Sequence, residues 1–257
     1  MLVIGLTGGI ASGKSTVSHL LASHNIPIID ADVLARRVVL PGTRAHAAIV
    51  AAFGPEILLP DGSGALDRAK LGAIVFNDES MRRRLNAIVH PAVNRAMLWA
   101  VVGCWVRGEK MCVVDVPLLV ETGSWKWVGK VVVVYLSKEL QLQRLTKRDN
   151  STPTAALARL NSQLPLASKL DYADHVIDNS GSLHDLDAQV DALVRRFHRD
   201  AGWTWRLAWL VPPIGIVMGV WRLAWRAVKR ARKGRGKKKG SSFGREGAIE
   251  LTSTDTS

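Results

Sequence analysis

Apolar residues in the first 200 positions form short unbroken runs that alternate with longer segments of helical spacing. The runs predict strands over Leu2–Leu6, Ile26–Ile29, Cys112–Val116, Val131–Leu136 and His175–Ile177. Apolar residues at every third or fourth position predict helices over Thr16–Ser23, Asp32–Val39, Arg44–Phe53, Asp67–Val75, Met81–Val106, Glu139–Lys147, Thr154–Gln163 and His184–Phe197. Unbroken apolar strands are typical of parallel strands that are covered on both faces. The pattern therefore predicts an α/β fold with a doubly wound parallel sheet of five strands.

The stretch between residues 44 and 106 has helical spacing but contains no predicted strand. We therefore expect a helical insertion between two strands of the sheet. Ligands of doubly wound sheets bind beyond the carboxyl ends of the strands. An insertion beside that edge is a suitable place for substrate recognition.

Residues 8–15 read Gly-Gly-Ile-Ala-Ser-Gly-Lys-Ser and fit the pattern G-x-x-x-x-G-K-[ST] at every fixed position. The segment follows a predicted strand and precedes a predicted helix, which is the setting of a P-loop. The alternative is a chance glycine-rich turn, which would need neither the strand before it nor the helix after it. Backbone N–H groups of such a loop and the N-terminus of the next helix bind phosphate oxygens. The residues predicted to hold ATP here are Gly8, Gly9, Ile10, Ala11, Ser12, Gly13, Lys14, Ser15 and Thr16.

The same loop predicts a metal site. In a P-loop, the lysine (here Lys14) reaches the β- and γ-phosphates, and the following hydroxyl (Ser15) ligates Mg²⁺. Asp115 follows an apolar strand, the usual position of the carboxylate that holds Mg²⁺ through water. We therefore expect Ser15 and Asp115 to bind the metal. Glu121 remains open between a substrate contact and an ordinary acid in the first turn of a helix.

Two further carboxylates, Asp30 and Asp32, follow the second predicted strand. A carboxylate at this edge of the sheet lies opposite the P-loop, where it could accept a proton from an acceptor hydroxyl or orient that hydroxyl. Aspartate is also a favoured N-cap residue. We expect Asp30 to cap the next helix and Asp32 to act on the acceptor.

Basic residues gather after the fourth predicted strand, at Arg144, Lys147, Arg148, Arg159 and Lys169. A charged helix face is often only solvated, which is our interpretation of Lys147. Arg144 and Arg148 are four residues apart and share a helix face. We expect them in a mobile lid over residues 144–170 that excludes water and brings guanidinium groups to the transferred phosphoryl group.

Together these segments resemble the dephospho-CoA kinase family, whose members phosphorylate the ribose 3′-hydroxyl of dephospho-coenzyme A. The resemblance covers about residues 2–195 and rests on Gly5–Ile10, Ser12–Ser15, Asp30–Asp32, Ala35-Arg36, Leu85–Pro91, Pro117–Leu119, Glu121, Arg144-Leu145, Arg148-Asp149, Arg159, Gln163 and Ala173–Gly181. The P-loop alone indicates only a nucleotide-dependent kinase. The His-Pro, Pro-Leu-Leu and Asn-Ser-Gly segments make the resemblance specific.

The resemblance implies a P-loop kinase fold and a role for each matching residue. Asp32 is then the base, Lys14 clamps the phosphates, and Arg144 and Arg148 belong to the lid. The residues placed beside the adenine of ATP are Asn179 and Gly181, and those on the dephospho-CoA side are His90, Pro117, Leu118 and Glu121.

Two of the matching positions need comment. A histidine before proline at a helix boundary often only caps or bends the helix, so the role of His90 stays open. Ala11 stands where the family usually has glycine, and because this is not a fixed P-loop position we expect little effect.

Charge and tryptophan are concentrated near the C-terminus. Residues 202–257 contain 12 lysines and arginines against three acids, whereas residues 1–201 contain 23 against 19. Five of the nine tryptophans lie between Trp203 and Trp225. We therefore divide the chain into a kinase-like domain (1–200), a Trp-rich apolar and basic segment that associates with a membrane (201–233), and a polar basic tail that is disordered (234–257).

The membrane segment has three open interpretations. Leu207–Trp221 is uncharged, but its 15 residues would cover about 22 Å as a helix, less than the ~30 Å hydrocarbon core. A single-pass anchor would also carry basic residues 226–239 across the membrane, against the positive-inside tendency. We favour an interfacial or re-entrant hairpin that turns at Pro212-Pro213 over this anchor and over an amphipathic helix packed on protein. This places the kinase on the cytoplasmic face of a membrane.

Composition excludes several other classes of protein. The two cysteines are too few for a disulfide framework and lack partners for a metal site, which fits a reducing compartment. Met1–Leu6 runs directly into the P-loop without a basic region, so we expect no signal peptide. No folded nucleic-acid-binding motif accompanies the basic tail, so a nucleic-acid partner is not expected. The sequence does not indicate an oligomeric state.

The main hypothesis is a membrane-associated kinase that uses ATP and Mg²⁺ to phosphorylate dephospho-CoA. One alternative is a kinase for another small molecule or nucleotide. Another is a catalytically silent P-loop protein that serves as a membrane-tethered scaffold. The presence of Lys14, Ser15, Asp32, Asp115 and the lid arginines argues against a silent protein, because a scaffold does not need them.

Overall fold

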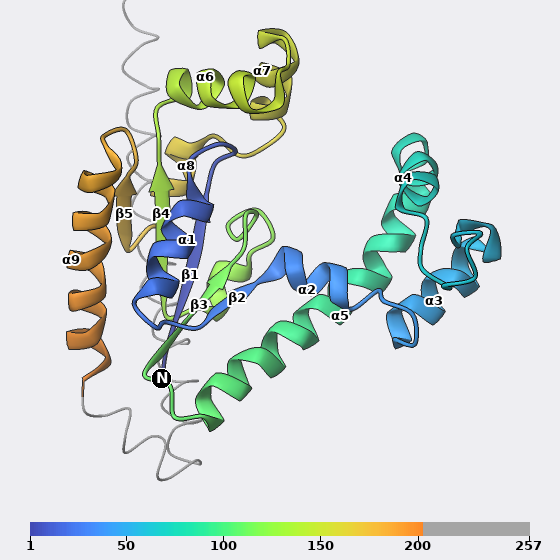
Figure 1. The fold of residues 1–257 in the computed structure, drawn as a ribbon, viewed down its shortest axis with the longest axis horizontal. Coiled ribbons are helices and arrows are strands. Elements are labelled where there is room, and N and C mark those ends of the chain that lie inside the picture. Colours follow the sequence, from blue (N-terminus) through green and yellow to red (C-terminus); the bar gives the residue numbers. More distant parts are fainter. Residues whose placement is uncertain (203–257) are drawn as a thin grey trace, which may run out of the picture.

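The computed structural model describes residues 1–202. Residues 203–257 lie outside the described residues. They contain nearly all of the predicted membrane segment (201–233) and the whole of the predicted polar tail (234–257). Five parallel strands form one sheet in the order β2-β3-β1-β4-β5 (Figure 1). They are β1 (Leu2–Gly8), β2 (Ile28–Asp30), β3 (Met111–Asp115), β4 (Lys130–Tyr135) and β5 (His175–Asp178). The predicted α/β class and the five predicted strands are confirmed.

The register of the sheet places acidic strand ends together. β1 is central and pairs with β3, where Leu6 lies opposite Asp115, and with β4 on its other side. β2 pairs with β3 so that Asp30 also lies opposite Asp115. Because all strands are parallel, their carboxyl ends meet at one edge of the sheet. The P-loop leaves β1 at this same edge.

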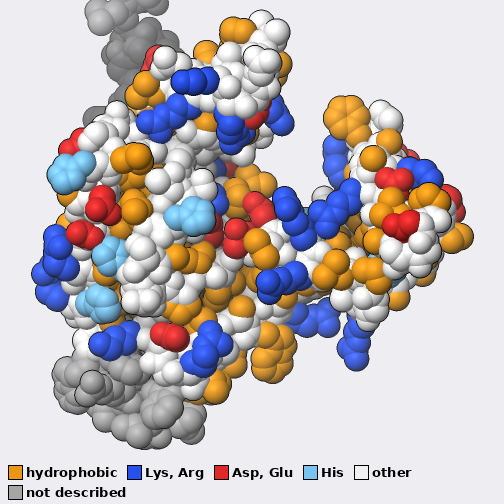
Figure 2. Space-filling model, in the orientation of Figure 1, with side chains coloured by type: hydrophobic (Ala, Val, Ile, Leu, Met, Phe, Trp, Pro, Cys, Tyr) orange, Lys and Arg blue, Asp and Glu red, His pale blue; other side chains and the backbone are white. Residues whose placement is uncertain are grey.

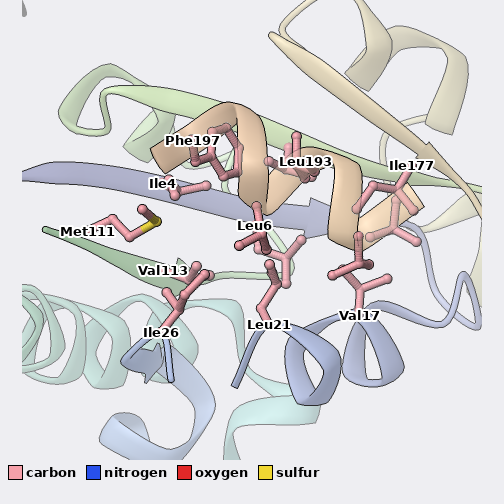
Figure 3. Packing of buried hydrophobic residues seen from close by; sticks show 14 of the residues in the cluster. Ile4, Leu6, Val17, Leu21, Ile26, Met111, Val113, Ile177, Leu193 and Phe197 are labelled. Atoms are coloured by element: carbon pink, nitrogen blue, oxygen red, sulfur yellow. The ribbon is translucent and has the colours of Figure 1, made fainter. Parts of the chain in front are cut away.

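Helices α1 (Lys14–Ser23) and α9 (Leu183–Ala201) cover one face of the sheet (Figure 1). Ser182 caps α9 and forms a reciprocal capping box with Asp185. Apolar side chains of both helices pack against the inward side chains of the strands (Figure 3). Members of this layer that are fully buried include Ile4, Leu6, Val17, Leu21, Val190 and Phe197.

The C-terminal part of α5 (Glu79–Val106) and the short helix α8 (Leu166–Leu170) pack on the opposite face. The loop after β3, which contains the 3-10 helix η2 (Ser124–Trp127), completes this layer. Cys104 of α5 and Cys112 of β3 are both free and buried here. Burial raises the pKa of the Cys112 thiol to about 12, so it stays protonated at neutral pH.

The segment between β2 and β3 begins and ends beside the sheet, and its outer part projects away from it (Figure 1). It consists of α2 (Ala31–Arg37), α3 (Arg44–Phe53), the 3-10 helix η1 (Pro55–Ile57), α4 (Arg68–Asn77) and α5. Its outer part has a small core of its own, formed by Ile49, Phe53, Ile57 and Leu71. Side-chain caps from Thr43, Asp67 and Asp78 begin α3, α4 and α5.

Helix α5 runs without interruption through Pro91. This confirms the single helix predicted over Met81–Val106, and His90 therefore does not lie at a helix boundary. A proline inside a helix removes one backbone hydrogen bond, and here α5 is supported on several sides by α2, α3, α4 and β3. Among the described residues, α5 is the one helix long and apolar enough to cross a membrane. A single helix of this kind is weak evidence for a membrane span.

The segment between β4 and β5 contains α6 (Lys138–Asp149), α7 (Pro153–Asn161) and α8. The helices predicted near α6 and α7 are confirmed, with shifted ends, whereas α8 was not predicted. Figure 1 shows α6 and α7 beyond the carboxyl end of the sheet, above the P-loop. This is the position in which the predicted lid would cover a bound nucleotide.

Candidate active site

The P-loop conformation depends on Gly13, which lies in the left-handed region (φ 85°) at the start of α1. A Cβ atom at this position would collide with the side-chain amide of Asn179. That amide donates a hydrogen bond to the Ser12 carbonyl at 2.8 Å, and the Asn179 carbonyl accepts one from Arg144 at 3.0 Å. The loop after β5 therefore packs directly against the P-loop and connects it to α6.

Two glutamines hold the tip of the P-loop. The Gln141 amide of α6 donates to the Ile10 carbonyl at 3.0 Å, and the Ile10 N–H donates to the Gln163 side-chain oxygen at 3.2 Å. Gln141 is buried, and a Cβ atom at Gly9 would collide with it. Side chains of α6 and of the predicted lid thus bind backbone groups of the P-loop.

Lys14, the first residue of α1, forms an ion pair with the Asp115 carboxylate at the end of β3. Asp115 is only 3% exposed. Burial raises the pKa of its carboxyl and the nearby Asp30 carboxylate adds to this rise, while the Lys14 ammonium opposes it. The ion pair fixes the lysine at the edge of the sheet where the strand ends meet.

Asp30 and Asp32 take separate positions, as predicted. Asp30 is the N-cap of α2 and accepts hydrogen bonds from the Asp32 N–H at 2.8 Å and the Val33 N–H at 3.1 Å. Its predicted capping role is confirmed. Asp32 lies in the first turn of α2 with an exposed side chain, so its carboxylate is free to approach a ligand.

A cavity of about 720 Å³ brings several predicted residues together. Lys14, Ser15, Asp32 and Asp115 line it, and it continues to Trp99 on α5. Figure 2 shows the hollow between the sheet and the projecting helices, with acidic side chains at its floor and basic side chains on the surfaces beside and above it. This arrangement suits an anionic ligand whose reacting group enters among carboxylates.

A second cavity, of about 380 Å³, lies on the lid side of the P-loop and shares Ser15 with the first. Its other lining residues are Ala11, Gly13, Thr16, Arg144, Arg148, Asn179, Gly181 and Leu183. All but Leu183 are residues that the sequence assigns to ATP or to the lid. The two cavities therefore meet at the first turn of α1.

The two lid arginines differ in their contacts. Arg144 reaches the Asn179 carbonyl beside the P-loop. Arg148 instead pairs with Asp149 at 2.8 Å, and Arg159 pairs with the same carboxylate at 2.6 Å. The hydrogen bond from Arg148 lowers the pKa of Asp149. In this conformation Arg144 is the guanidinium nearer to the P-loop backbone.

The residues predicted on the acceptor side are less closely grouped. His90 is exposed in the middle of α5 and lines neither of the two cavities. Leu118 is 42% exposed, and the Pro117 carbonyl accepts a hydrogen bond from the Thr7 hydroxyl at 2.9 Å. Glu121 forms an ion pair with Lys169 at 2.7 Å. The substrate contacts assigned to these four residues stay predictions.

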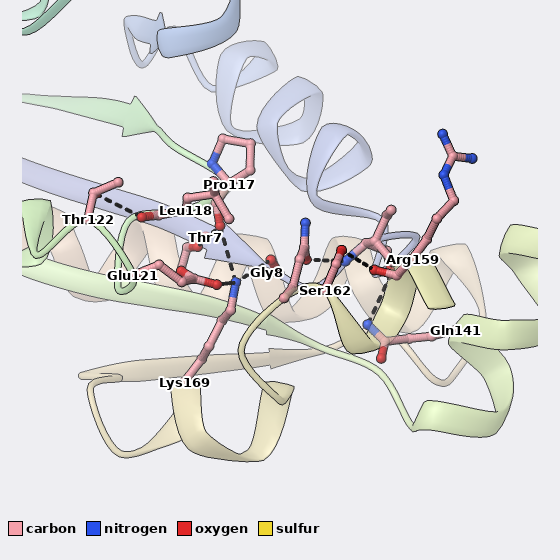
Figure 4. A network of polar contacts seen from close by, with 12 residues as sticks. Thr7, Gly8, Pro117, Leu118, Glu121, Thr122, Gln141, Arg159, Ser162 and Lys169 are labelled. Carbon is pink, nitrogen blue, oxygen red and sulfur yellow. Dashed lines mark hydrogen bonds and ion pairs between the residues drawn. The ribbon is translucent and has the colours of Figure 1, made fainter. Parts of the chain in front are cut away.

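Lys169 is the residue whose position the sequence did not predict. It belongs to the basic cluster of the lid, yet in the structure it is completely buried beneath the P-loop (Figure 4). The flanking Leu166 and Leu170 give a weak signal of a short buried helix, which is too short for helical spacing to identify.

Ala11 has a positive φ of 58°, in the region that favours glycine. We expect Ala11→Gly to raise the free energy of unfolding by about 1 kcal/mol, because a Cβ atom is disfavoured in this conformation. Ala47→Gly, at an exposed position inside α3, is the matched control and should lower it by about 1 kcal/mol. Urea unfolding measures both. Equal destabilisation by the two changes would contradict the assigned backbone conformation.

The chain is similar to known dephospho-CoA kinases. The family model for dephospho-CoA kinase matches residues 2–185. The dephospho-CoA kinase of Geobacillus kaustophilus is 51% identical over 196 residues, which cover 76% of this chain and 96% of that protein. The enzyme of Arabidopsis thaliana is 47% identical over 208 residues, covering 80% and 89%.

A solved structure gives the same result. The dephospho-CoA kinase from Campylobacter jejuni superimposes with a TM-score of 0.62 at 30% identity, over 77% of this chain and 98% of that one. Sequence and fold therefore agree, and the chain belongs to the dephospho-CoA kinase family.

Proposed function

We propose that this chain transfers the γ-phosphoryl group of ATP to the ribose 3′-hydroxyl of dephospho-CoA. The observation that carries the proposal is the meeting of two cavities at the first turn of α1. One contains the P-loop and lid residues, and the other contains Asp32. A donor nucleotide and an acceptor bound in these cavities would approach each other at Lys14 and Ser15.

On the donor side, the backbone N–H groups of the P-loop and the N-terminus of α1 bind the phosphates. When ATP binds, the Lys14 ammonium either leaves Asp115 or bridges Asp115 and the γ-phosphate. In both cases it neutralises charge on the transferred group. Arg144 contributes a second cation from the lid. Closure of the lid excludes water, so that the acceptor hydroxyl rather than water receives the phosphoryl group.

The residues present fit a bound Mg²⁺. The buried Asp115 carboxylate and the Ser15 hydroxyl offer oxygen ligands beside Lys14, and oxygen is the ligand atom that Mg²⁺ prefers. Within residues 1–202 no group of three or more His, Cys, Asp or Glu could hold a metal ion by itself. Phosphate oxygens and water would therefore complete the coordination. When bound, Mg²⁺ neutralises phosphate charge.

On the acceptor side, Asp32 orients the ribose hydroxyl and accepts its proton. Its carboxylate is exposed in the larger cavity, whereas that of Asp30 is committed to two backbone N–H groups. Asp30 also lines this cavity, but its Oδ1 accepts both of those hydrogen bonds, which supports a structural role for Asp30 and the chemical role for Asp32.

The proposed function is tested by the acceptor specificity of the full chain. We expect ADP release with ATP and dephospho-CoA, and much slower release with adenosine or nucleoside monophosphates. Lys14→Ala should reduce the rate by orders of magnitude, because it removes the cation beside the transferred phosphate. Faster turnover with a nucleoside monophosphate would assign the chain to another kinase activity, and absent turnover would indicate a silent protein.

The assignment of the two aspartates is tested by amide variants. We expect Asp32→Asn to lower kcat by about 100-fold or more, in the range of lost general-base catalysis, with little change in ATP affinity. Asp30→Asn keeps an N-capping side chain and is the matched control, with kcat near wild type. Steady-state kinetics and ATP titration measure both effects. Loss of kcat in Asp30→Asn but not in Asp32→Asn would reverse the assignment.

We also propose that the C-terminal segment attaches the kinase to the cytoplasmic face of a membrane. The support is its composition, in which five tryptophans and an uncharged stretch are followed by basic residues. Tryptophan favours the membrane interface, and lysine and arginine are attracted to anionic headgroups.

Vesicle sedimentation tests this attachment. We expect the full chain to sediment with anionic vesicles, more weakly at high salt, and a chain ending at Gly202 to stay in the supernatant while retaining kinase activity. In the hairpin arrangement, protease outside sealed vesicles removes an epitope placed after Ser257. Protection of that epitope would indicate a single-pass anchor instead, and equal sedimentation of both chains would contradict the attachment.

A further inference from the structure

Lys169, on α8, is a charged side chain with no exposed surface. Lysine is rarely buried unless its charge is paired. Its Nζ atom lies 2.7 Å from Glu121 Oε1, 3.3 Å from the Gly8 carbonyl oxygen and 3.2 Å from the Pro117 carbonyl oxygen (Figure 4). An ammonium group has three N–H donors, so these three acceptors satisfy it completely.

The three acceptors belong to segments that carry the chemistry. Gly8 is the last residue of β1 and the first of the P-loop. Pro117 follows Asp115 by two residues, and its carbonyl also accepts a hydrogen bond from the Thr7 hydroxyl. Lys169 lies beneath these two segments, and it therefore links the P-loop to the segment that follows Asp115.

Two other roles fit the contacts less well. A direct phosphate contact would require Lys169 to be accessible and to have a free N–H group, and it has neither. A role in stability alone would not require a charge, because well-packed apolar residues often stabilise a protein as much as a buried ion pair does.

We propose that Lys169 is a positioning residue for phosphoryl transfer, which holds Gly8 and Pro117 at a fixed separation so that Lys14 and Asp115 meet in reacting geometry. The inference rests on the proposed kinase function. Lys169 also adds a contact with the P-loop to the two that Gln141 and Gln163 make at Ile10.

The test is Lys169→Met in the full chain, which keeps an unbranched side chain but removes all three N–H donors. A displacement of about 1 Å in a catalytic group can cost about 100-fold in rate. We expect kcat to fall by about 10- to 100-fold per folded molecule, while the dissociation constant for ATP changes by less than about threefold. The P-loop N–H groups and Lys14, which bind the phosphates, are all still present in this variant.

Lys147→Met is the matched control, because Lys147 is exposed on α6, and its kcat should equal that of wild type. If Lys169→Met does not fold, Lys169→Met/Glu121→Gln leaves no unpaired charge and carries the same expectation. A lost substrate contact of Glu121 would raise the KM for dephospho-CoA, whereas lost positioning lowers kcat.

Wild-type kcat in either Lys169 variant would overturn the inference, as would an ATP affinity that falls in parallel with kcat. Failure of the proposed function is distinguishable, because the wild-type chain itself would then show no turnover that depends on dephospho-CoA. That result would overturn both.

Discussion

The ion pair between Lys14 and Asp115 joins the first residue of α1 to the end of β3, and the candidate active site is arranged around it. It depends on the parallel register, which brings the ends of β1, β2 and β3 to one edge and sets Asp30 opposite Asp115. Burial disfavours the charged carboxylate and the lysine opposes this effect. The buried sheet therefore positions a cation where ATP phosphates would bind.

The surrounding segments serve this edge in different ways. Gln141, Gln163 and Asn179 hold the P-loop backbone from the lid side, and Lys169 holds it from below. The helices inserted between β2 and β3 form the far wall of the larger cavity. The two cavities are thus lined by strand ends and P-loop residues together with residues of the inserted helices.

Local sequence patterns predicted the five strands, the P-loop and the cap at Asp30, because each depends on neighbours in the chain. The strand order and the burial of Lys169 depend on contacts between distant segments. Lys169 and Glu121 are 48 positions apart, and neither has a local signal for their pairing. The positive φ of Ala11 is likewise not indicated by its residue type.

The most direct test of this account is a crystal structure of the chain with dephospho-CoA and a non-hydrolysable ATP analogue. We expect the ribose 3′-oxygen within hydrogen-bond distance of the Asp32 carboxylate, in line with the γ-phosphorus, and the Lys14 ammonium on the γ-phosphate. An acceptor hydroxyl bound to Asp30, or placed away from the larger cavity with both ligands present, would contradict the account.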